Sequence, residues 1–130
     1  MTIQHQARPP VSPLALWGGL VGGAVAWTVH LIGIWVVAEF GCVAARGGDG
    51  GVITLTYVLL SVLSLLCLAG AGLAAFVAWR SERQIAASGE DAPGRDTGLF
   101  MARTGIIANG LFALVIVSQT VPLFFFASRC

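Results

Sequence analysis

Three long runs of apolar residues, almost free of charge, constrain this chain more than any other feature. They cover 14–40, 52–79 and 104–128, and the only charged residue inside them is Glu39. Each run is longer than the roughly 20 residues that span a hydrocarbon layer ~30 Å thick. None shows the alternation of apolar and polar residues that a membrane-barrel strand requires. The runs therefore predict an all-α integral membrane protein with three transmembrane helices.

The composition agrees with this prediction. The chain has 130 residues, of which 57% are hydrophobic and 10% charged, whereas about a quarter of the residues of a soluble domain are charged. Polar, glycine-rich or proline-containing segments separate the apolar runs. The expected organisation is a tail at 1–13, helices at 14–40, 52–79 and 99–128, and connections at 41–51 and 80–98.

The distribution of arginine predicts the orientation of the spans. Basic residues concentrate on the cytoplasmic side of a membrane. The tail, the second connection and the start of the third span hold Arg8, Arg80, Arg83, Arg95 and Arg103, against Arg46 and Arg129 on the other side. We therefore expect a cytoplasmic N-terminus and a periplasmic C-terminus in a bacterial inner membrane. The arginines are scattered, so no nucleic-acid partner is expected.

All three runs are expected to bring polar side chains to one depth, in the outer half of the membrane. The depth follows from counting residues inward from the outer ends of the helices at ~1.5 Å per residue. Pro122 adds to this level, because it cannot donate a hydrogen bond to the carbonyl group of Ser118. The predicted polar layer consists of His30, Ser61, Ser64, Ser118 and Gln119.

The polar layer has two interpretations. In the first, it is a structural clamp of interhelical hydrogen bonds, each worth ~0.6–2 kcal/mol. In the second, His30 binds a haem or relays protons, since ionisable residues inside a membrane often mark such sites. The other histidine, His5, is expected on the opposite side and cannot supply a second axial ligand. No metal site is expected, because His30 lies ~18 Å along a helix from Cys42.

Small residues in each run predict close helix packing. The segment WGGLVGG contains two glycine pairs at the four-residue spacing that lets helix backbones approach. These glycines are Gly18, Gly19, Gly22 and Gly23. Alanine and glycine also fill 69–75, and the third run has small residues together with Asn109 at a similar depth. The packing partner is either another helix of this chain or a larger neighbouring protein.

The three cysteines fall into two classes. Cys67 lies within the second span and is expected to be a packing residue. Cys42 and Cys130 are both expected at the outer surface, where an oxidising periplasm favours disulfides. The sequence thus predicts a Cys42–Cys130 disulfide, and the alternative is two unpaired thiols.

Three segments of the chain resemble a known group of proteins. These are AWTVHLIGIWVVAEFGC, AAFVAWRSER and LVIVSQTVPLFFFASRC. They resemble small three-span proteins of proteobacteria whose genes lie beside those of haem-copper cytochrome c oxidases. The residues that carry the resemblance are Trp27, His30, 39–42, Gln119, Pro122 and Cys130. Members of that group often end in Pro-Cys, whereas Arg129 precedes Cys130 here.

The resemblance implies a non-catalytic accessory or assembly subunit of a respiratory complex, most simply a haem-copper terminal oxidase. It implies a larger partner that carries haem and copper, lipids between the two proteins, and no cofactor of this chain's own. The sequence has no phosphate-binding loop and no CxxC motif, so no enzymatic activity is expected. Two alternatives stay open. One is a homo-oligomeric transporter or channel component whose polar layer at His30 and Gln119 lines a pathway, and the other is a membrane haemoprotein ligated by His30.

Overall fold

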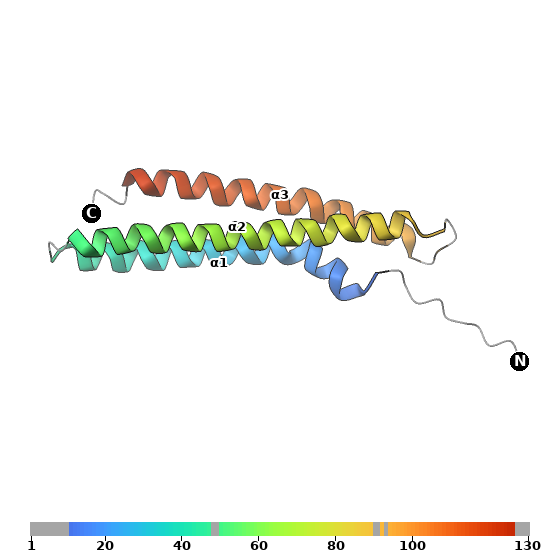
Figure 1. Cartoon of the computed structure of the whole chain (residues 1–130), viewed down its shortest axis with the longest axis horizontal. Coiled ribbons are helices and arrows are strands. Elements are labelled where there is room, and N and C mark those ends of the chain that lie inside the picture. The colour runs from blue at the N-terminus through green and yellow to red at the C-terminus, as the bar shows by residue number, and fades with distance from the viewer. Residues whose placement is uncertain (1–10, 48–49, 90–91, 93, 127–130) are drawn as a thin grey trace, which may run out of the picture.

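The computed structural model of the chain consists of three long helices packed side by side, as Figure 1 shows. It describes residues 11–47, 50–89, 92 and 94–126. The helices are α1 (Pro13–Ala45), α2 (Gly50–Ala86) and α3 (Arg95–Phe126). All three are long and apolar enough to cross a membrane, so the prediction of an all-α chain with three helices that could span a membrane is confirmed. Each helix is longer than the apolar run from which it was predicted.

The sequence explains where α1 and α3 begin. Ser12 is the N-cap of α1, and its hydroxyl oxygen accepts a hydrogen bond from the amide of Ala15 at 3.3 Å. Pro13 follows at the first helical position, where its missing N–H costs nothing. Gly94 precedes α3 with a φ of 77°, a left-handed conformation that glycine adopts without strain. α3 then continues through Pro122 to Phe126.

Small residues bring α1 and α2 into contact along their length. A Cβ atom added at Gly19 would lie 3.1 Å from Ala78, and one added at Gly22 would lie 2.6 Å from the Cβ of Ala74. Farther along the two helices, a Cβ atom added at Gly33 would collide with the side chain of Leu63. Glycine is therefore the residue that allows these two backbones to approach each other.

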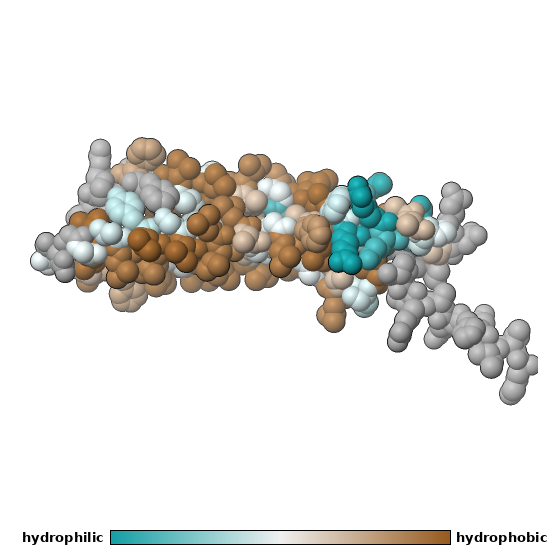
Figure 2. Space-filling view, in the orientation of Figure 1, coloured by the Kyte–Doolittle hydropathy of each residue, from teal (hydrophilic) through white to brown (hydrophobic). Residues whose placement is uncertain are grey.

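The core is small and lies where the three helices meet. Cys67 and Ala71 of α2 pack with Ile116 of α3, whose side chain is fully buried. Trp27 of α1 packs against this cluster and contacts the ring of Phe112, with ring centroids 5.7 Å apart. The outer surface is mostly apolar, as Figure 2 shows for one face.

Charged side chains gather at the end where α2 finishes and α3 begins, and Figure 2 shows the hydrophilic surface there. Arg103 of α3 forms an ion pair with Glu82 of α2 at 2.8 Å. The guanidinium of Arg83 lies over the ring of Trp79, 4.3 Å from its centroid. Arginine and tryptophan are typical of the level of the lipid headgroups.

Candidate functional site

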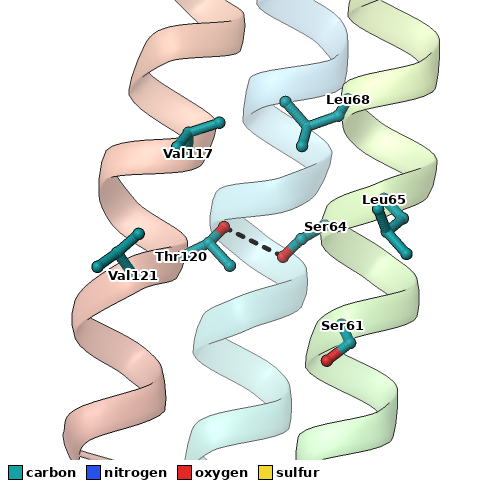
Figure 3. A pocket seen from close by; sticks show the side chains of 7 residues that line it. All are labelled: Ser61, Ser64, Leu65, Leu68, Val117, Thr120 and Val121. Carbon is teal, nitrogen blue, oxygen red and sulfur yellow. Dashed lines mark hydrogen bonds between the residues drawn. The ribbon is translucent and has the colours of Figure 1, made fainter.

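A buried cluster of polar side chains joins all three helices. Nε2 of His30 in α1 lies 3.0 Å from Oγ of Ser64 in α2 and 3.1 Å from Oγ1 of Thr120 in α3. The two hydroxyl groups are themselves hydrogen-bonded at 3.2 Å, as Figure 3 shows. His30 is fully buried and Ser64 is nearly so. We call His30, Ser64 and Thr120 the histidine cluster.

The helices position this cluster through the residues on either side of it. One turn along α1, Gly33 packs against Leu63 of α2, so the two helices are close at this level. On the other side of His30, Trp27 packs against the core cluster of Cys67, Ala71 and Ile116. The hydroxyl of Thr120 also donates to the carbonyl of Ile116 at 2.7 Å, which fixes its position.

Three buried polar atoms close to this level have no hydrogen-bond partner among the described residues. They are Nδ1 of His30, Oε1 of Gln119 and Nε1 of Trp27. The Gln119 side chain interacts with the imidazole of His30, yet neither Oε1 nor Nδ1 has a bond of good geometry. Buried polar groups are rarely left unpaired, so each of these three atoms is expected to have a hydrogen-bond partner.

The structure brings together some of the residues of the predicted polar layer and separates others. His30 and Ser64 are bonded to each other, and Gln119 lies beside the ring. Ser61 donates to the carbonyl of Tyr57 in its own helix. Ser118 is exposed and donates to carbonyl groups of its own helix, including that of Leu114 at 2.8 Å. The serines of the predicted layer thus differ in the direction in which they point.

Thr120 was not among the predicted residues of the layer, although the sequence contains a signal for it. Asn109, Ile116 and Thr120 are spaced by seven and four residues, which places them on one face of a helix. Asn109 and Ile116 are both buried in the structure. Since an asparagine within a transmembrane helix is expected to face protein, this face could have been extended to Thr120.

A second buried polar contact lies farther along the bundle. The amide nitrogen of Asn109 donates to the carbonyl of Gly19 in α1 and, at 2.7 Å, to that of Gly105 in its own helix. Its oxygen has no conventional partner among the described residues. A Cβ atom added at Gly23 would collide with that oxygen, so only glycine leaves room for the carboxamide at this position.

The four predicted packing glycines behave differently. A Cβ atom added at Gly19, Gly22 or Gly23 would meet a neighbouring helix. One added at Gly18 would meet nothing within 4 Å. Three of these glycines therefore lie at contacts within the chain, whereas Gly18 faces outward.

A groove of about 300 Å³ opens between α2 and α3 beside the histidine cluster. Figure 3 shows that Ser64 and Thr120 lie at its inner side. Ser61 also lines the groove, and the rest of its wall is apolar, formed by Leu65, Leu68, Val117 and Val121. His30 lies behind the two hydroxyl groups to which it is bonded and is not among the lining residues.

The predicted Cys42–Cys130 disulfide involves a residue outside the described part of the chain. Cys42 lies near the end of α1 and is half-buried, but Cys130 is not among the described residues. The disulfide therefore stays a prediction. Cys67 has a free thiol and is buried in the core.

Comparison of the chain with models of protein families, with curated proteins and with solved structures finds no match. Within the described residues there is also no group of three His, Cys, Asp or Glu side chains that could hold a metal ion. The functional argument thus rests on the geometry of the bundle and on the sequence resemblance.

Proposed function

We propose that this protein is a non-catalytic accessory or assembly subunit of a bacterial respiratory membrane complex, with a haem-copper terminal oxidase as the expected partner. In this proposal it resides in the inner membrane with its N-terminus in the cytoplasm and its C-terminus in the periplasm. The haem and copper belong to the partner. The supporting observation is the direction in which the side chains point: the buried polar groups bond one another across the helices, while the outer faces are apolar.

Outward-facing glycines give the proposal further support. Gly72 of α2 and Gly110 of α3 are exposed, and a Cβ atom added at either would meet nothing within 4 Å. Internal packing therefore does not explain them, although glycine costs ~1 kcal/mol relative to alanine inside a helix. Small residues on the outside of a transmembrane helix suit the close approach of another helix.

Large apolar side chains complete this outer surface. Trp35 and Phe40 of α1 are 68% and 71% exposed, and Phe100 and Phe125 of α3 are each 70% exposed. Lipid tails cover such residues in any membrane protein. In the proposed complex, the helices of a larger subunit and the lipids between the two proteins share that surface.

The geometry of His30 gives less support to the two alternatives. A haem ligand needs a ring nitrogen that faces a space large enough for the haem, but His30 is fully enclosed by its own three helices. A pathway through a homo-oligomer needs polar side chains that face the neighbouring copies. His30, Ser64 and Thr120 instead bond one another within a single chain.

Purification of a tagged copy, expressed at its natural level and extracted with a mild detergent, tests the proposal. We expect mass spectrometry to identify oxidase subunits and the reduced-minus-oxidised visible spectrum to show their haem. A tagged three-span protein of unrelated sequence is the control for adventitious copurification. A chain that purifies as a homo-oligomer without haem supports the transporter alternative, and a haem spectrum from the chain alone supports the haemoprotein alternative.

A further inference from the structure

The contacts of the histidine cluster determine where its hydrogen atoms lie. Four heavy-atom contacts have to be explained. These are Nε2 of His30 with Ser64 at 3.0 Å and with Thr120 at 3.1 Å, Thr120 with Ser64 at 3.2 Å, and Thr120 with the carbonyl of Ile116 at 2.7 Å. A carbonyl oxygen can only accept, so the single hydroxyl hydrogen of Thr120 is directed at Ile116.

The tautomer of His30 follows from the remaining hydrogen atoms. If Nε2 carried no hydrogen, the one hydroxyl hydrogen of Ser64 would have to serve both Nε2 and Thr120. The contact between Nε2 and Thr120 would then bring two lone pairs to 3.1 Å. If Nε2 carries the hydrogen, it is shared between the two hydroxyl oxygens, and Ser64 donates to Thr120. Only this second arrangement satisfies all four contacts.

Nδ1 of His30 is then an acceptor in need of a donor. A second hydrogen on this nitrogen would make the ring a cation, and a buried cation is costly in a membrane. Among the described residues, the polar side chains that interact with the ring belong to Ser64, Thr120 and Gln119. None of them carries a negative charge that would compensate the cation.

Gln119 is the residue that can supply the donor. Its side chain interacts with the ring, and its Oε1 atom is buried without a partner, as is Nδ1. The oxygen and nitrogen of a carboxamide have almost the same shape, and their assignment follows from hydrogen bonding. Rotation of the amide by a half-turn directs its NH₂ group at the ring and moves the unpaired oxygen away from that acceptor.

We propose that Gln119 is the positioning residue that donates to Nδ1 and holds His30 in the neutral Nε2–H tautomer, with Ser64 and Thr120 sharing the Nε2 hydrogen. The inference depends only on the contacts within the bundle and not on the proposed function. Both ring nitrogens are then occupied by protein groups from the other two helices. His30 acts as a neutral hydrogen-bonding node, and metal or haem ligation would require the loss of one of these bonds.

Nitrogen NMR of the full-length chain in lipid nanodiscs tests the tautomer directly. The chain contains two histidines, so the substitution His5→Gln leaves His30 as the only imidazole that carries a ¹⁵N label. Protonated and bare ring nitrogens have clearly separated chemical shifts, and couplings to the ring carbons distinguish Nδ1 from Nε2. We expect a protonated Nε2 and a bare Nδ1 at neutral pH. A protonated Nδ1, alone or together with Nε2, overturns the proposal.

Variants of Gln119 test its part in the arrangement. At a pH high enough to ionise the carboxyl group of Gln119→Glu, this side chain accepts but cannot donate, so we expect a hydrogen on Nδ1. Gln119→Met has a similar length and no donor, so we expect a mixture of tautomers. Ser118→Ala, at an exposed neighbouring position, should keep the pattern of the parent chain. If both Gln119 variants keep that pattern as well, Gln119 does not select the tautomer, whatever they do to stability.

A measurement on the chain without a Gln119 substitution covers the case in which these variants fail to fold. Magnetisation transfer between the side-chain NH₂ of Gln119 and Nδ1 of His30 reports their proximity directly. We expect a transfer typical of a hydrogen bond. Its absence, with labelled Gln119 resolved in the spectrum, contradicts the proposed donor.

Discussion

Gly23 of α1 packs directly on Asn109 of α3, because a Cβ atom added at Gly23 would collide with the carboxamide oxygen of Asn109 and lie 3.0 Å from its Cα. The asparagine can reach the backbone of α1 only because this position has no side chain. The glycine and the asparagine therefore form one unit, in which close approach and hydrogen bonding depend on each other.

Gly23→Ala should destabilise the bundle by roughly 1–3 kcal/mol, the usual cost of overpacking a tight core. Both the backbone of α3 and a buried amide would have to move. Gly18→Ala is the matched control, because nothing lies within 4 Å of its added Cβ atom, and alanine should raise stability by up to ~1 kcal/mol. The measurement is reversible unfolding in mixed micelles, followed by circular dichroism. Equal effects at the two positions would contradict the contact.

Asn109→Leu should cost ~0.6–2 kcal/mol through the loss of the interhelical hydrogen bond to Gly19. Thr28→Val is a suitable control, since the hydroxyl of Thr28 is exposed and donates only to the carbonyl of Ala24 in its own helix. The same unfolding assay compares the two substitutions. A smaller loss of stability for Asn109→Leu than for Thr28→Val would show that the asparagine does not hold α1 and α3 together.

Ser64→Ala and Thr120→Val should each destabilise the bundle by ~0.6–2 kcal/mol. The double variant should cost less than the sum of the two, because both hydroxyl groups contact the same nitrogen of His30 and residues in one network are not additive. Ser118→Ala, which removes an exposed hydroxyl bonded to its own helix, should change stability by less than ~0.5 kcal/mol. Strict additivity of Ser64→Ala and Thr120→Val would count against a shared network.

The predicted Cys42–Cys130 disulfide can be tested by thiol labelling and intact mass. In the folded chain we expect no label, since Cys67 is buried and a buried thiol is unreactive. Unfolding without reduction should expose one thiol, and unfolding with reduction should expose all three. Cys42→Ser should free Cys130 for labelling in the folded chain. Labelling of three thiols without reduction would leave the two outer cysteines as unpaired thiols.

The ion pair between Glu82 and Arg103 should contribute little despite its length of 2.8 Å. The side chain of Arg103 is 67% exposed, and exposed pairs are typically worth ~0.2–1 kcal/mol and weaken with salt. Glu82→Gln should therefore cost less than ~1 kcal/mol at low salt and less still at high salt. The measurement is the free energy of unfolding of the parent chain and of Glu82→Gln at low and at high salt. A large, salt-independent loss would indicate that Glu82 has another partner.

The number of helices, and the common level along the bundle at which His30 and Ser64 meet, could be predicted from the sequence. A bilayer allows only helices and closed barrels to cross it, and a constant rise per residue converts position into depth. The direction of each side chain could not be predicted in the same way. The spans are apolar all around, so no apolar stripe distinguishes the inner face. For this reason Ser61 and Ser118 could not be separated from Ser64 and Thr120 by composition alone.

The region of close contact between helices could also be predicted from the sequence, but the particular glycines that face a neighbouring helix could not. Four glycines at the spacing of a packing motif identify the region of α1 that another helix approaches, but the spacing contains two overlapping pairs. Whether Gly18 or Gly19 faces the neighbour depends on the rotation of α1 about its axis. That rotation is set by Asn109 and Ala78, which contact Gly19 from two different helices.

Arg83 is stacked on Trp79, a pairing typical of the lipid headgroup level, so the position of this pair sets the depth at which we expect the histidine cluster to lie. Ser64 lies about 22 Å from Trp79 at the helical rise of 1.5 Å per residue, within hydrocarbon ~30 Å thick. The opposite surface of the bilayer is thus the nearer one. We expect short-chain lipids, which thin the bilayer, to bring that surface toward His30 and speed deuterium exchange at its ring, whereas long-chain lipids should keep the ring dry.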